Sequence, residues 1–284
     1  MTVGTRAEKV LQWPGLRGMA ALGLVGLALL TGCATSSGTG FAQSQEEAAT
    51  AAASGGEGES DAQRRARIRL ELAASYFERG QFNVALDEIR QVLAINPNLA
   101  DAYNLRGLVF MRLDDQAMAQ ESFRRAASLR PNDPDVAHNY GWLLCQQKNY
   151  VQAQQQFEQA LAQRNYNARH KTFMAQGLCL QAEGKEAPAL QALLKSYELD
   201  PGNPVVGYNL ALLLRRQGDL ERAQFYIRRL NNSEYANAES LWLGIKVERG
   251  LSDPVAVRQL ADQLRKRFPD SKQMLAYERG AFNE

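Results

Sequence analysis

The chain has 284 residues, of which 45% are hydrophobic and 23% are charged. Its 33 Lys and Arg residues nearly balance 31 Asp and Glu residues, so the formal net charge is only +2 at pH 7. This balance lacks the dense positive charge on which nucleic-acid binding depends, and we expect no nucleic-acid partner. The richness in Ala, Leu and Gln, without the alternation typical of strands, indicates an all-helical protein.

Residues 1–32 have the three parts of a secretory signal peptide. Arg6, Lys9 and Arg17 supply positive charge, and the uncharged run at residues 19–30 is too short to span a bilayer as a stable helix. Removal of the signal would take away three basic residues and one acidic residue and leave 30 of each. The remaining chain would then carry no formal net charge.

A string of four residues closes this apolar run: Leu30, Thr31, Gly32 and Cys33. It resembles the lipobox of bacterial lipoproteins, in which the cysteine receives lipid and becomes the new N-terminus after cleavage. The alternative is a membrane-anchoring N-terminal helix with an incidental cysteine. A lipidated Cys33 would carry several acyl chains, which is enough for a stable anchor. In Gram-negative bacteria an aspartate after the cysteine retains lipoproteins in the inner membrane, whereas Ala34 implies the outer membrane, facing the periplasm.

We expect residues 33–60 to form a lipidated, flexible tether. They are small and polar apart from one aromatic residue, Phe41, and such a composition buries too little apolar area to offset the entropy of ordering. A coil of this length reaches roughly 30 Å. The domain that follows would therefore stay near the membrane while searching for a partner.

Residues 61–284 are predicted to form one domain of repeated helix pairs. Pro97 and Pro131 lie 34 residues apart, and Pro201 belongs to a later copy of the same signal. A period of 34 is typical of tetratricopeptide repeats, which are stacks of antiparallel helix pairs. The sequence thus predicts an all-α tetratricopeptide superhelix of about six helix-turn-helix repeats. The repeats start near Ala66, Ala100, Pro134, His170, Pro204 and Asn237.

The residue types within each repeat have a packing explanation. In the second repeat, Gly107 and Ala119 let the two helices approach closely, and Phe110 and Phe123 fill the space between them. A proline such as Pro131 ends the second helix, because it cannot continue the hydrogen-bond ladder. One pair cannot bury its apolar face alone, so the pairs stack around a continuous core.

No pattern in the sequence indicates catalysis. The two histidines, His138 and His170, lie in different repeats, and no Cys, His, Asp and Glu set has metal-ligand spacing. No glycine-rich phosphate loop follows a strand, and no nucleophile is paired with a base. We therefore expect no enzyme activity, no cofactor, no metal and no small-molecule substrate.

Cys145 and Cys179 fall on the first helices of neighbouring repeats. Neighbouring helix axes lie about 9–10 Å apart, while the Cα atoms of a disulfide usually lie within roughly 7 Å. This comparison favours two small buried thiols. A disulfide is the alternative, because an oxidising periplasm would permit it.

The first helices of such an array line its concave face, and their apolar residues are candidates for a partner-binding groove. A large exposed apolar patch usually marks a partner site. The alternative is that curvature closes the groove and these side chains pack on neighbouring helices. The predicted groove residues are Leu70, Ala74, Phe77, Leu108, Met111, Trp142 and Met174.

The chain resembles the outer-membrane lipoproteins of type IV pilus biogenesis and stability, which are the pilotins of the pilus secretin. The resemblance runs from the lipobox through all six repeats, with one departure, Asn165, where a proline is usual. Its more specific parts are the strings at residues 138–141, 147–150, 177–180, 240–246 and 267–269.

The resemblance implies a binding protein anchored in the outer membrane. Its partner would be the secretin subunit, whose outer-membrane localisation and multimerisation it would promote. Pilus biogenesis and twitching motility would depend on it. The alternative function is a tetratricopeptide lipoprotein scaffold of the outer-membrane barrel-assembly or cell-wall machinery.

Overall fold

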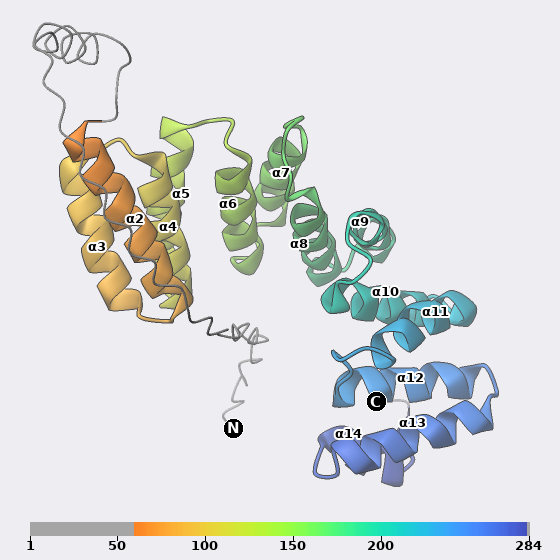
Figure 1. Ribbon diagram of the computed structural model, residues 1–284. Coiled ribbons are helices and arrows are strands. Elements are labelled where there is room, and N and C mark those ends of the chain that lie inside the picture. Colours follow the sequence, from red (N-terminus) through yellow and green to blue (C-terminus); the bar gives the residue numbers. More distant parts are fainter. Residues whose placement is uncertain (1–59, 283–284) are drawn as a thin grey trace, which may run out of the picture. The chain divides into compact units, whose positions relative to one another are not determined.

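The structure, a computed structural model, describes residues 60–282, which belong to one compact unit. The expected signal peptide, the lipobox Leu30 to Cys33 and the tether before residue 60 lie outside the described residues. Within the described part, the chain forms thirteen α-helices and no strand (Figure 1). The helices are α2 (Asp61–Glu78), α3 (Phe82–Ile95), α4 (Ala100–Arg112), α5 (Gln116–Leu129), α6 (Pro134–Gln146), α7 (Tyr150–Leu161), α8 (Arg169–Ala182), α9 (Glu186–Leu199), α10 (Pro204–Arg216), α11 (Leu220–Asn231), α12 (Ala238–Gly250), α13 (Pro254–Arg267) and α14 (Lys272–Glu278).

The helices pack in chain order as six pairs, from α2 with α3 to α12 with α13. The second helix of each pair also contacts the first helix of the next pair, so that the pairs stack (Figure 1). The prediction of an all-helical tetratricopeptide superhelix of six repeats is therefore confirmed. After the sixth pair, α14 packs against both α12 and α13 and covers their apolar side chains at this end of the stack.

Close approach within the pairs depends on small residues. The alanine at the same place in each of the first five second helices is completely buried. These residues are Ala85, Ala119, Ala153, Ala189 and Ala223. The rings of Phe123 and Phe157 are also completely buried, between the helices of the second and third pairs. The packing expected from the repeat pattern is the packing observed.

The second helix is shorter in the third and fifth repeats than in the other four. Helices α7 and α11 have 12 residues each, whereas α3, α5, α9 and α13 have 14 each. Residues 162–168 continue without regular helix, and Tyr166 in this segment is buried against Ala137 and Ala160. In the third repeat, which has Asn165 where a proline is usual, a buried aromatic side chain therefore holds the connection to α8.

Candidate functional site

The predicted groove residues all lie on the first helices of the first four pairs, α2, α4, α6 and α8. Each is half-buried: part of its surface packs on the core and part remains accessible. On α2, Leu70, Ala74 and Phe77 contact one cluster of buried residues, and the Phe77 ring centroid lies 6.0 Å from that of Phe82. The N-terminal end of the candidate surface is therefore apolar and supported from behind by the core.

The other groove residues belong to separate clusters. Leu108 and Met111 on α4 pack beside the buried Phe123, Trp142 packs beside the two cysteines, and Met174 packs on the cluster that continues to α12. The structure thus places the seven side chains in four local groups on successive helices, without joining them in one packed cluster. Whether they receive a partner stays a prediction.

Polar side chains connect the same first helices, and the sequence reasoning did not find these connections. Asn139 on α6 donates from Nδ2 to Oδ1 of Asn104 on α4 at 3.1 Å. Nδ1 of His138 lies 2.9 Å from Oγ1 of Thr172 on α8, which also lies 2.8 Å from the hydroxyl of Tyr166. The only signal in the sequence was that these polar residues recur at intervals near the repeat length.

Burial perturbs one member of this network. Removal from solvent, together with a smaller effect of the nearby positive charge of Lys171, lowers the pKa of His138 from 6.5 to about 4. The imidazole is therefore neutral at neutral pH. His138 acts as a structural group between α6 and α8.

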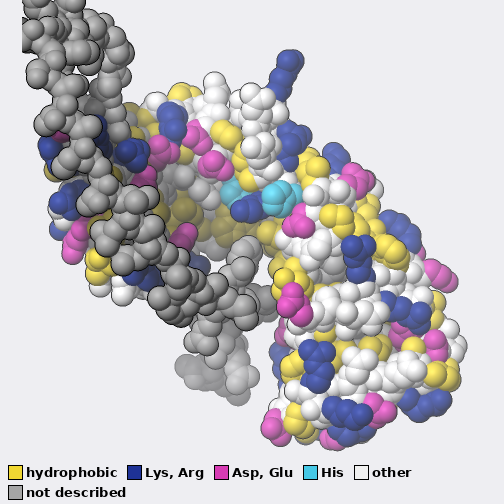
Figure 2. All heavy atoms as spheres, in the orientation of Figure 1, with side chains coloured by type: hydrophobic (Ala, Val, Ile, Leu, Met, Phe, Trp, Pro, Cys, Tyr) yellow, Lys and Arg dark blue, Asp and Glu magenta, His cyan; other side chains and the backbone are white. Residues whose placement is uncertain are grey.

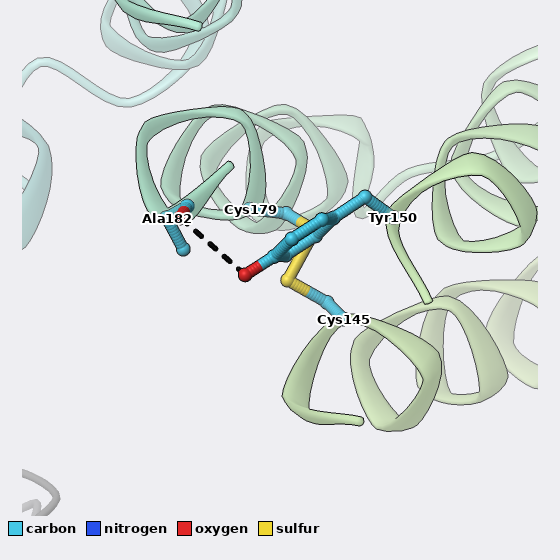
Figure 3. The surroundings of a disulfide bond; sticks show 4 residues. All are labelled: Cys145, Tyr150, Cys179 and Ala182. Atoms are coloured by element: carbon cyan, nitrogen blue, oxygen red, sulfur yellow. Dashed lines mark hydrogen bonds between the residues drawn. A yellow bond between two sulfur atoms is a disulfide. The ribbon is translucent and has the colours of Figure 1, made fainter. Parts of the chain in front are cut away.

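Cys145 and Cys179 form a disulfide between α6 and α8 (Figure 3). The preference for two free thiols was wrong. The Cα atoms lie 5.8 Å apart, although neighbouring helix axes are typically about 9–10 Å apart. The Cα atoms lie about 2.3 Å from each helix axis, so residues that face each other across the contact come several ångströms closer than the axes do.

Tyr150 lies against this disulfide (Figure 3). Its hydroxyl donates to the carbonyl oxygen of Ala182 at 3.3 Å, near the end of α8. A covalent bond, the hydrogen bond of His138 and the hydrogen bond of Tyr150 therefore all connect the third repeat to the fourth. This junction is held at several points along α8.

The accessible surface carries both signs of charge. Figure 2 shows Lys and Arg side chains interspersed with Asp and Glu side chains, and hydrophobic side chains lie between them. No cluster of three His, Cys, Asp or Glu residues suited to a metal ion occurs in residues 60–282. Over the same residues, no helix has the length and apolar character needed to cross a bilayer.

Two family matches agree with the stacked helix pairs. The family described as TPR repeat matches residues 73–114, and the family described as tetratricopeptide repeat matches residues 115–177. These matches and the six stacked helix pairs show a tetratricopeptide repeat protein by fold, a class whose repeats form extended binding surfaces.

Within this class, the chain is homologous to two type IV pilus proteins, PilF and PilW. The type IV pilus assembly protein PilF of Pseudomonas aeruginosa is 29% identical over 201 residues, which are 71% of this chain and 80% of that protein. The solved structure of Pseudomonas aeruginosa pilF matches with a TM-score of 0.72 at 27% identity, covering 78% of this chain and 100% of that chain. PilW, described as a widely conserved type IV pilus biogenesis factor, matches with a TM-score of 0.68 at 28% identity, covering 75% and 97%.

Proposed function

We propose that this protein is an outer-membrane lipoprotein of type IV pilus biogenesis, a pilotin that binds the pilus secretin and promotes its localisation and multimerisation. The observation that carries the proposal is the homology to PilF across 71% of the chain. The resemblance of residues 30–33 to a lipobox supports the lipid anchor and the periplasmic orientation. The protein would act by binding, without catalysis, and twitching motility would depend on it.

The apolar side chains on α2 and α4 are the proposed secretin contact. Leu70, Phe77, Leu108 and Met111 are half-buried, so they offer accessible apolar surface on a rigid support. Helix α2 directly follows the tether in sequence. A secretin segment bound there would be held near the target membrane, because tethering raises its effective concentration without new contacts.

Co-purification of the secretin with the full chain tests this proposal. Phe77→Arg should abolish co-purification, because it places a charge on the proposed apolar contact. The helical content should stay unchanged, because an arginine stem can cover apolar surface while its charge stays in water. Ile68→Arg is the matched control. Ile68 is 52% exposed on the same helix and lies nine residues from Phe77, about two and a half turns, so it occupies the opposite side. Wild-type co-purification by Phe77→Arg would rule out this contact.

A deletion strain distinguishes the pilotin from the barrel-assembly or cell-wall scaffold. Loss of a pilotin should remove secretin multimers and surface pili while the cells remain viable. Loss of a barrel-assembly subunit should instead reduce outer-membrane proteins in general. General loss with normal secretin multimers would contradict the proposed role.

A further inference from the structure

A hollow of about 200 Å³ lies among α9, α10 and α11. Gly207 of α10 forms part of its wall, together with Tyr197 of α9, Tyr226 and Arg229 of α11, and Tyr235 of the following loop. A Cβ added at Gly207 would meet no heavy atom within 4 Å. An apolar cavity of about 150 Å³ can hold benzene, so this hollow has room for one aromatic ring.

The position of Gly207 within its repeat is taken by an aromatic residue in two other repeats. In the second repeat Tyr103 occupies it, and the Arg125 guanidinium lies 5.7 Å from the ring centroid. In the fourth repeat Phe173 occupies it, and the Lys195 ammonium lies 5.5 Å from the ring centroid. In both repeats the cation stands 22 residues after the ring.

The fifth repeat retains the cation but has no ring. Arg229 stands 22 residues after Gly207, and its guanidinium lies 5.9 Å from the ring centroid of Tyr197 instead. The third repeat, by contrast, has neither partner: Ala137 replaces the ring and Gln159 replaces the cation. The fifth repeat therefore keeps half of a cation–π pair beside an open space.

Three further features of the hollow suit a ligand. The hydroxyl of Tyr197 is buried without a hydrogen-bond partner among the described residues. Tyr235 at the edge is 51% exposed. Arg229 is the one charged residue among the described residues that line the hollow, and none of them is acidic. A buried polar atom without a partner is costly, so a hydrogen-bonding ligand would stabilise this arrangement.

We infer that the hollow at Gly207 is a second docking site, which receives an aromatic side chain of a partner polypeptide beneath Arg229. The ring would take the position that Tyr103 and Phe173 take in their own repeats, and Arg229 would lie over it. The backbone of the partner could satisfy the Tyr197 hydroxyl. This site goes beyond the proposed secretin contact, because that contact lies on α2 and α4.

Selection of peptides tests the inference without a known partner. Phage displaying random peptides would be panned on the full chain in phospholipid nanodiscs. Empty nanodiscs and an excess of the Gly207→Leu variant would compete, so that lipid binders and peptides bound elsewhere are removed. The enriched peptides should share an aromatic residue, whose replacement by Ala abolishes binding. Absence of any enriched peptide would overturn the inference.

Three variants connect the binding to the hollow. Gly207→Leu fills it and should weaken binding of the selected peptides at least about tenfold, as expected for loss of a buried anchor. Gly207→Ala is the matched control, because it adds one methyl group to the same helix position and should retain binding. Arg229→Gln should weaken binding about three- to tenfold. Thermal unfolding should show that Gly207→Leu is folded, since glycine is the poorer helix former. Equal binding by Gly207→Leu, or equal loss in both Gly207 variants, would overturn the inference.

Discussion

Gly107 lies directly against the ring of Phe123: a Cβ added to this glycine would be 2.6 Å from the nearest ring carbon. The same relationship recurs 16 residues apart in the next two repeats. A Cβ at Gly141 would lie 2.9 Å from the Phe157 ring, and one at Gly177 would lie 2.7 Å from Leu193. Glycine is thus required at these positions for the close approach of the paired helices.

Alanine at Gly107 should therefore destabilise the protein. Overpacking against a completely buried ring costs about 1–3 kcal/mol, while the better helix propensity of alanine returns up to about 1 kcal/mol. We expect a net loss of roughly 1–2 kcal/mol in the free energy of unfolding, measured by urea denaturation. Gly207→Ala is the control: its Cβ meets open space, so it should stabilise the protein slightly. A stabilised Gly107→Ala variant would contradict the packing described here.

Reduction of the Cys145–Cys179 disulfide should lower the stability of the stack. The bond closes a loop of sequence separation 34, for which the chain-entropy model gives about 3–4 kcal/mol. Dithiothreitol should shift the urea midpoint of the wild type downward and leave the Cys145→Ser/Cys179→Ser variant unchanged. Intact-mass measurement of the unreduced protein after thiol alkylation supplies the direct check. Two alkylated thiols would contradict the disulfide.

Acid should destabilise the junction between the third and fourth repeats. The pKa of His138 is about 4 in the folded state, whereas an ordinary histidine side chain has a pKa of 6.5, so the unfolded state binds the proton first as the pH falls. The contribution of neutral His138 to the free energy of unfolding is present in full above pH 6.5 and is lost as the pH falls from 6.5 to 4. The loss is on the order of 2–3 kcal/mol.

Carboxylates also titrate in this pH range, so the effect of His138 must be measured as a difference in stability between the wild type and a variant. Unfolding of the wild type and of His138→Gln should be compared at pH 7.5, 5.5 and 4.5, values chosen around the window set by the lowered pKa. The stability advantage of the wild type should shrink as the pH falls. A constant difference across these values would mean that His138 does not titrate as described.

The membrane anchor gives a prediction about Cys33. Replacement by Ser should prevent incorporation of labelled palmitate, because serine offers no thiol for lipid attachment. The variant should also leave the membrane fraction, since several acyl chains provide the stable anchor. Cys145→Ser, which leaves Cys33 in place, is the control. Palmitate labelling that persists in Cys33→Ser would exclude the lipobox interpretation.

The fold could be predicted from the sequence because the same residue types recur at equivalent positions of each repeat. The 34-residue spacing of Pro97 and Pro131, the glycine at Gly107 and the alanine at Ala119 each have one packing explanation, and neighbouring repeats give the same answer independently. The positions of the predicted groove residues on the first helices also followed from the repeat pattern, while their role in binding a partner stays a prediction. These are properties of helical periodicity, which a sequence displays directly.

Pairings between repeats could not be read in the same way. Whether Cys145 meets Cys179 depends on how α6 and α8 are rotated toward each other, and a difference of a few ångströms separates a bond from two thiols. Neighbouring helices likewise decide that His138 contacts Thr172 and that the space beside Gly207 is open. Helical periodicity fixes which face a residue occupies. The distance to a residue one repeat away depends on the packing of whole helices, and that information is distributed over every contact between them.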